Sequence, residues 1–161
     1  MAQLLMTGLL WFSAIGCGLI AGVYFAFSTF IMTSFARIAP AAGIAAMNAI
    51  NIDIVKSVFM PLFFGTTLAA AILVGLAFFR WNGPGSMSVL AGGVIYVIGM
   101  LGVTLIFNVP LNDGLAAVDP SSGEGASFWA RYVQDWAFWN HVRLIASIVA
   151  SVLFIIGLTA K

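Results

Sequence analysis

The residue types that could do chemistry gather in one stretch, from Trp129 to Arg143 (WARYVQDWAFWNHVR). An imidazole whose unperturbed pKa lies near neutrality can act as a general base, and a guanidinium can stabilise a negatively charged oxygen. Indole rings can stack on flat aromatic molecules. An aromatic belt where a helix enters a membrane would explain the tryptophans and Arg131. It explains less of Asn140, His141 and Arg143, which follow the last tryptophan and so lie deeper.

A second polar stretch lies between residues 36 and 57. Within it Asn48 and Asn51 are three residues apart and share a helix face, and Asp53 and Lys56 form another such pair. These side chains precede an apolar segment, so we expect a helix with a polar run that continues into a membrane span.

The third polar stretch is FNVPLND, at residues 107–113. Pro110 has no N–H and crowds the carbonyl of Ile106, which predicts that the helix kinks or stops there. The freed carbonyl needs a donor, and Asn108 or Asn112 could supply it. A structural role and a ligand-binding role for these two asparagines both remain open.

Composition shows what kind of molecule must position these groups. Hydrophobic residues make up 63% of the 161 residues, charged residues only 7%, and the mean hydropathy is +1.13. A soluble domain carries about 25% charged residues, so we expect a multi-pass integral membrane protein, in the cell (inner) membrane. The net charge of +1 gives no hint of nucleic-acid binding, and the lone Cys17 excludes an intramolecular disulfide.

Apolar segments predict an all-α, four-helix membrane bundle as a single domain over residues 1–161. We expect spans at residues 4–35, 58–79, 87–107 and 140–160, with polar helical extensions and a cap on one membrane face. Four spans place both termini and the turn at Arg80 on one side, called face A, and the three polar stretches on the other, called face B. Every Asp and Glu, the histidine and four of the six Lys and Arg residues then belong to face B. The excess of cations weakly favours face B in the cytoplasm.

Helical geometry divides the Trp-rich stretch into two sides. At about 100° per residue, one stripe holds the following residues, with Asn140 at its edge: Trp129, Tyr132, Trp136, Arg143 and Ser147. His141 falls on the opposite side, beside Gln134, Phe138 and Ile145. A straight helix therefore cannot direct both His141 and Arg143 into one pocket. Either one of them is structural, or His141 faces a second subunit, or the helix is distorted.

The phrases GVYFAFSTF, AMNAIN, FFGT, FNVPLND and WARYVQDWAFWNHVR together resemble the DUF1772 family of small four-span membrane proteins, which includes the anthrone oxygenases of polyketide pathways. The resemblance covers nearly the whole chain, and FNVPLN with a downstream WNHVR is its most specific combination. It implies a four-helix membrane domain with an oxygenase-like activity on a lipophilic aromatic or phenolic substrate.

An anthrone has an acidic C–H between two aryl rings, and its carbanion can react with O2 directly. The candidate catalytic residues are His141 as the base and Arg143 as the stabiliser of the enolate oxygen, a role that Lys56, Asn108 or Asn112 could also take. The candidate substrate-binding residues are Asn108, Asn112, Trp136, Trp139, Asn140, Lys56 and Asn51. The alternative is that His141 has a purely structural role, with its hydrogen bonds made within the bundle.

No cofactor is predicted. One His and no usable Cys cluster exclude a thiolate or multi-His site within one chain, while a haem with one His, or a metal between two copies of His141 in a homo-oligomer, stays open. The expected partners are the lipid bilayer and a lipophilic small molecule. The alternative function is a non-enzymatic permease-like protein or a scaffold that binds partners. A transport path needs polar residues through the membrane depth, whereas here they collect at one end.

Overall fold

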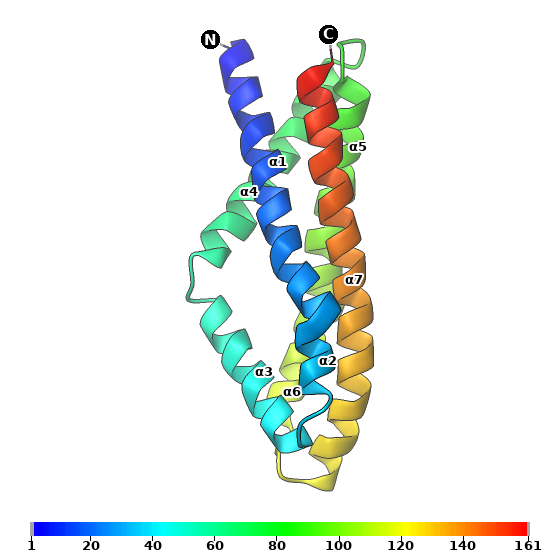
Figure 1. Cartoon of the computed structure of the whole chain (residues 1–161). Coiled ribbons are helices and arrows are strands. Elements are labelled where there is room, and N and C mark those ends of the chain that lie inside the picture. The colour runs from blue at the N-terminus through cyan, green and yellow to red at the C-terminus, as the bar shows by residue number, and fades with distance from the viewer. Residues whose placement is uncertain (1, 161) are drawn as a thin grey trace.

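The computed structural model describes residues 2–160, and this part of the chain forms an elongated bundle of helices without strands (Figure 1). Four helical stretches are long and apolar enough to cross a membrane: Gln3–Phe35, Phe59–Phe79, Ser86–Ala117 and Gly123–Thr159. The prediction of an all-α membrane bundle is confirmed. The third and fourth stretches extend beyond the predicted spans, because each continues as helix through its polar stretch.

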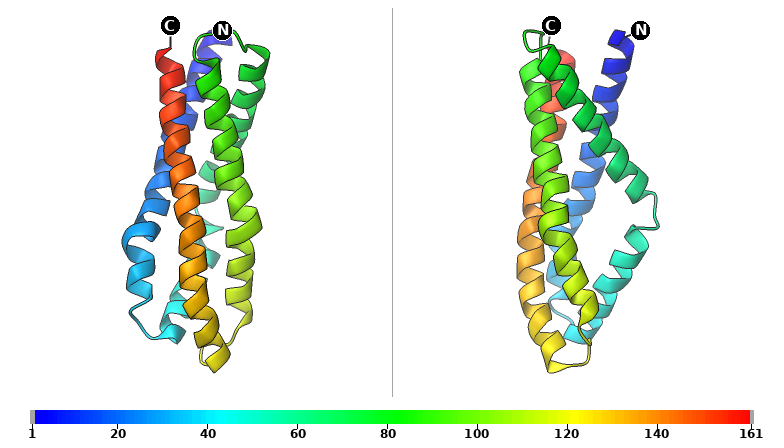
Figure 2. Two further views of the ribbon diagram at one scale, coloured as in Figure 1. Left: turned by 90° about the vertical axis from the view of Figure 1, so that its right-hand side faces the viewer. Right: turned by 180° about the vertical axis from the view of Figure 1, so that it is seen from behind.

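The helices follow one another up and down. The elements are α1 (Ala2–Ala26), η1 (Phe27–Ile31), α2 (Met32–Phe35), α3 (Pro40–Ile54), α4 (Phe59–Phe79), α5 (Ser86–Tyr96), η2 (Val97–Gly102), η3 (Thr104–Asn108), α6 (Val109–Ala117) and α7 (Gly123–Thr159), where η marks a π-helical segment. Both ends of the chain and the α4–α5 turn lie at one end of the bundle, which is face A (Figures 1 and 2). The α2–α3 and α6–α7 connections lie at the other end, face B, so all three polar stretches belong to the same half of the molecule.

Small residues let the helices pack closely in the half toward face A. A β-carbon added to Gly93 of α5 would lie 2.5 Å from a methyl carbon of Val74, and one added to Gly99 would lie 2.7 Å from the β-carbon of Ala146. Hydrogen-bond donors on these backbones are satisfied within the helices, so close approach brings only dispersion contacts. Large apolar side chains on the outside, such as Leu68 and Ile98, are exposed to the surrounding bilayer.

The prediction that the helix of the second polar stretch continues into the membrane span is wrong, because α3 ends at Ile54 and α4 begins at Phe59, just before Pro61. Pro61 is the third residue of α4, and its ring would crowd the carbonyl of Ser57 if the helix ran through. The chain instead opens between Ile54 and Phe59, where the Ser57 hydroxyl accepts a hydrogen bond from the Phe59 N–H at 3.2 Å and donates to the Ile54 carbonyl at 2.8 Å. As a result the α3–α4 junction bows away from the other helices at mid-height (Figure 1).

Pro110 does not end the third segment. It is the second residue of α6, and the preceding turns form the π-helical segment η3, in which the Val109 N–H bonds to the Thr104 carbonyl, five residues back. The wider π turn accommodates the proline without stopping the helix, which continues to Ala117. Of the two expected outcomes at Pro110, the stop is therefore wrong, and the helix continues through a local π-helical distortion.

Candidate functional site

A cavity of about 190 Å³ lies on the inner side of the α3–α4 bow. It is enclosed by α1 and η1, by α3 and α4, by the third segment around η3, and by α7. Aliphatic and aromatic side chains make up most of its wall: Val23, Phe27, Met47, Ile50, Ile54, Val55, Phe59, Met60, Phe63, Phe64, Leu105 and Val109. Six side chains with polar atoms complete it: Tyr24, Asn51, Thr104, Asn112, Trp136 and Arg143. A mainly apolar cavity with a few convergent polar groups is typical of a ligand site, although this one is smaller than the ~300–1,000 Å³ of most.

Arg143 places a positive charge in the wall of this cavity. Its side chain is 6% exposed, and its guanidinium donates to Asn140 Oδ1 at 2.8 Å and to the Thr104 hydroxyl at 3.4 Å. The guanidinium carbon lies 4.3 Å from the centre of the Tyr24 ring and 5.2 Å from that of Trp136. These partners are all neutral, and no Asp or Glu lines the cavity. A buried charge without a counter-ion lowers the stability of the fold. A contribution to stability therefore does not explain why Arg143 is buried here.

The buried, unpaired polar side-chain atoms of the residues that line the cavity are all hydrogen-bond donors. Three buried side-chain atoms of cavity-lining residues have no hydrogen-bond partner: Nε of Arg143, Nε1 of Trp136 and Nδ2 of Asn51. Each of these nitrogens is a hydrogen-bond donor. The wall of the cavity therefore holds three unpaired donors and a positive charge, which suits a ligand with a negatively charged oxygen.

The stripe predicted on the final helix forms the inner side of α7. Trp129, Tyr132 and Trp136 are all buried and follow one another with ring-centre distances of 5.6 Å and 6.3 Å. The Tyr132 hydroxyl donates to Asn112 Oδ1 at 2.8 Å, which joins α7 to α6, and the Trp136 ring lies 5.3 Å from that of Phe27 in η1. These contacts hold the row of rings against α6 and η1, and Trp136 is the ring of the row that lines the cavity.

Two predicted site residues act as fixed supports in the structure. Asn140 is fully buried, and its Nδ2 donates at 2.8 Å both to the Tyr24 carbonyl and to the Ser28 hydroxyl, while its Oδ1 accepts from Arg143. Asn108 is also buried, and its Nδ2 donates to the Trp136 carbonyl at 3.3 Å. Neither lines the cavity, and Asn108 joins η3 to α7 without bonding to the carbonyl that Pro110 frees.

Three other predicted site residues lie outside the cavity. His141 is exposed on the opposite side of α7, as helical geometry predicts, and its Nδ1 lies against the Ala137 carbonyl. Trp139 stacks on Phe107 with ring centres 3.5 Å apart, and Lys56 is exposed at the α3–α4 junction. Because α7 is unbroken here, the structure brings together Arg143 and Trp136 but not His141. The role of His141 as a base stays a prediction.

Several cavity residues could not be chosen from the sequence. Tyr24 and Phe27 come from the end of α1 and from η1, and Thr104 from η3. Two of the three π-helical segments therefore border the cavity, and such segments are frequent at functional sites. The spacing of Tyr24 and Ser28, four residues apart in the first apolar segment, was a weak signal that this face turns inward.

Among residues 2–160, no group of three or more His, Cys, Asp and Glu side chains is placed to hold a metal ion. Cys17 is fully buried in the bundle core and lies apart from the cavity.

Comparisons with known proteins agree with this arrangement. The family model described as anthrone oxygenase matches residues 52–153, which is more than half of the chain. The matched part runs from the end of α3 to the last turns of α7, and so includes Asn112, Trp136 and Arg143. No curated protein and no solved structure matches the chain. The resemblance inferred from FNVPLND and WNHVR is confirmed, and the chain belongs to the anthrone oxygenase family.

Proposed function

We propose that the protein catalyses the O2-dependent oxidation of a lipophilic aromatic or phenolic substrate, which it binds as an oxyanion in the cavity beside Arg143. The observation that carries this proposal is the set of unused donors on Arg143, Trp136 and Asn51, together with a guanidinium that has no acidic partner in the cavity wall. In a low-dielectric site these groups favour the anion over the neutral molecule, because nothing else compensates the positive charge.

The chemistry follows from stabilising that anion. An aryl-CH2-aryl substrate with a conjugated carbonyl loses a C–H proton to water and becomes an enolate whose oxygen lies beside Arg143. The carbanion carbon reduces O2 and forms a C–O bond, which gives a hydroperoxide after protonation. Loss of the second C–H proton with cleavage of the O–O bond then gives the ketone and one water. The balance is CH2 + O2 → C=O + H2O, so this route requires no additional reductant.

Membrane-dissolved substrates have a direct route to this cavity. Val55 at the α3–α4 junction and Phe64 in α4 are 57% and 58% exposed, and both also line the cavity. The chain is not helical between Ile54 and Phe59, so side chains there, such as that of Val55, can move without breaking helical hydrogen bonds. Substrate enters from the bilayer at this junction, and a flat multi-ring molecule is accommodated by outward movement of the same side chains.

The test compares two arginines of α7. Arg143→Gln should lower the rate of O2-dependent conversion of an anthrone by about 10²–10³-fold, the usual effect of removing an oxyanion-stabilising group. Arg131→Gln removes the same charge from an exposed position of the same helix and should leave the rate unchanged. Arg143→Lys should restore only part of the activity, because an ammonium lacks the planar fork. Equal rates for the wild type and a folded Arg143→Gln variant would contradict the proposal.

One observation favours a second candidate, passage of a small molecule through the bundle. The hydroxyls of Ser13, Thr66 and Tyr96 are buried without partners between the cavity and face A. They are neutral and line none of the cavities described above, so they support this candidate less than the donors around Arg143 support the first. Flux of a phenolate probe across proteoliposomes, compared between the wild type and Thr66→Val, separates the two.

A further inference from the structure

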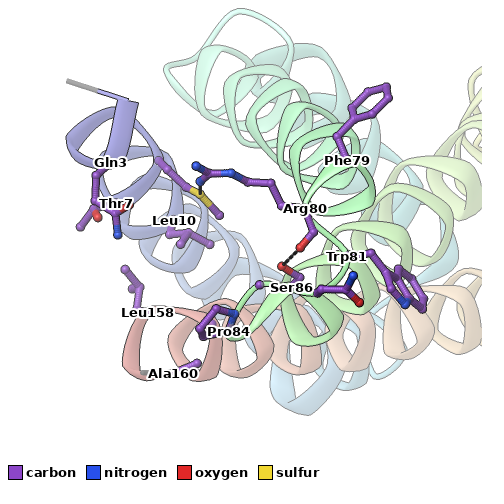
Figure 3. Close-up of a pocket in the computed structure, with 14 residues that line it drawn as sticks. Gln3, Thr7, Leu10, Phe79, Arg80, Trp81, Pro84, Ser86, Leu158 and Ala160 are labelled. Carbon is purple, nitrogen blue, oxygen red and sulfur yellow. Dashed lines mark hydrogen bonds between the residues drawn. The ribbon is translucent and has the colours of Figure 1, made fainter.

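A larger cavity lies at the opposite end from Arg143. It is an open cleft of about 710 Å³ between the first turns of α1, the end of α4, the α4–α5 turn and the last turns of α7 (Figure 3). The candidate spans begin at Gln3 and end at Phe79 and Thr159, so this cleft lies where the bundle leaves the hydrocarbon at face A. Trp81 is half exposed beside it, at the depth where tryptophan side chains anchor in the interface.

A single guanidinium dominates the charge of this cleft. Arg80 follows the last residue of α4, and its side chain reaches toward α1, where its one hydrogen bond goes to the sulfur of Met6 at 3.3 Å (Figure 3). A thioether is a weak acceptor, so most of the guanidinium's donors are unused. No Asp or Glu lines the cleft, because all acidic side chains of the chain belong to the face B half. The cleft therefore complements a negative group.

Polarity changes with depth in the cleft. Gln3, Thr7 and Asn82 lie exposed around its opening, while Leu10 and Leu158 form its apolar inner part. A ligand with an anionic headgroup and a hydrocarbon chain matches both ends of this gradient. A role for Arg80 limited to the end of α4, where a cation offsets the partial negative charge of the helix terminus, would require no cleft beside it.

We propose that this cleft binds an anionic glycerophospholipid, with its phosphate on Arg80 and its acyl chain along Leu10 and Leu158. Inorganic phosphate shares the headgroup's charge, but it would leave the apolar part of the cleft empty. Near a membrane surface each Lys or Arg contributes about fivefold to the binding of anionic lipid, and a direct hydrogen-bonded contact adds to this.

The experiment uses the full chain in phosphatidylcholine nanodiscs that contain a minor fraction of phosphatidylglycerol, with native mass spectrometry to count the retained lipid. Wild-type protein should retain phosphatidylglycerol in preference to phosphatidylcholine, and Arg80→Gln should lower this preference by about tenfold. The matched control is Arg37→Gln, which removes an exposed charge next to the first span at face B and should lower the preference by no more than the general effect of about fivefold. If Arg80→Gln does not fold, Arg80→Lys takes its place, with a smaller loss in the same direction expected.

A second measurement separates the lipid from its soluble headgroup. Phosphatidylglycerol should raise the thermal unfolding midpoint of the wild type, while inorganic phosphate and glycerophosphoglycerol should not, because only the lipid fills the apolar part of the cleft. Equal stabilisation by the soluble phosphates would overturn the lipid assignment. An unchanged lipid preference in a folded Arg80→Gln variant, or an equal loss in Arg37→Gln, would overturn the site.

Discussion

The two ends of the bundle each place a guanidinium beside a cavity, but they hold it in different ways. Arg143 is almost fully buried, fixed by Asn140 at 2.8 Å and covered by the rings of Tyr24 and Trp136. Arg80 is exposed, and its one side-chain hydrogen bond within the described chain goes to the thioether of Met6. Burial and fixed neighbours strengthen the interaction of Arg143 with an anion, whereas water and salt weaken that of Arg80.

The difference in burial suits Arg143 to catalysis and Arg80 to lipid binding. A preorganised charge in a dry cavity can stabilise a developing oxyanion without reorganising at the moment of reaction. An exposed charge in an open cleft gains little for catalysis, but it is sufficient to select a lipid headgroup. We therefore assign the reaction to the enclosed cavity and lipid binding to the open cleft.

The largest expected effect comes from removing the support of the buried guanidinium. Asn140→Leu removes the hydrogen bonds that Asn140 makes with the Tyr24 carbonyl, the Ser28 hydroxyl and Arg143, and should lower the free energy of unfolding by about 3 kcal/mol. At the other end, Ser86→Ala removes one hydrogen bond to the Arg80 carbonyl and should cost about 1 kcal/mol. Denaturant unfolding in detergent, followed by circular dichroism, measures both. Equal losses would mean that the two ends are held equally firmly.

A smaller effect is expected where α3 packs on the aromatic row. A β-carbon on Gly43 would lie 2.5 Å from a ring carbon of Trp129, so Gly43→Ala should push α3 outward and cost about 1–3 kcal/mol. Gly75→Ala in α4 is the matched control, because nothing lies within 4 Å of the added carbon, and it should stabilise by about 0.5–1 kcal/mol. The same unfolding assay applies. Stabilisation by both substitutions would show that α3 is not held against Trp129.

Added salt should weaken anion binding at Arg80 much more than at Arg143. Raising the ionic strength from about 0.1 M to about 1 M shortens the screening length from about 10 Å to about 3 Å, which should reduce the phosphatidylglycerol preference of the exposed Arg80 site severalfold. Binding of a phenolate ligand beside buried Arg143 should change much less. Native mass spectrometry and ligand titration measure the two effects. Parallel loss at both ends would contradict the contrast between them.

The smallest effect is expected at His141. Its side chain is exposed and outside the cavity, so His141→Ala should change turnover of an anthrone by less than about threefold, whereas loss of a general base lowers turnover by about 10²–10⁴-fold. Steady-state O2 consumption distinguishes the two ranges. A loss in the larger range with an intact fold would return His141 to the role of base, acting from outside this cavity or in a neighbouring copy.

Much of the fold follows from local patterns in the sequence. Hydropathy locates the four membrane segments, and the period of the α-helix places Trp129, Tyr132, Trp136 and Arg143 on the inner side of α7 with His141 outside. Position along the chain also explains why the polar stretches share one half of the bundle, since the spans alternate in direction. These properties depend on spacing within one helix, which a single sequence reveals.

The cavity depends on contacts between helices, which no local pattern records. Tyr24 and Thr104 join the site only because α1 and η3 approach Arg143. The π-helical turn that absorbs Pro110 also depends on its neighbours, so a kink was the natural expectation. The break before Pro61 was not predicted either, although the proline ring crowds the carbonyl of Ser57 wherever the helix is placed.

The most direct test of the account measures the pKa of a bound phenol. A hydroxylated anthraquinone, whose neutral and anionic forms differ in absorbance, is titrated in detergent micelles with the wild type, with Arg143→Gln and without protein. Binding beside the uncompensated guanidinium should lower the apparent pKa of the phenol by about 1 to 3, and Arg143→Gln should abolish this decrease. A phenol pKa that is unchanged or raised on binding to the wild type would contradict the claim that the cavity binds its ligand as an anion.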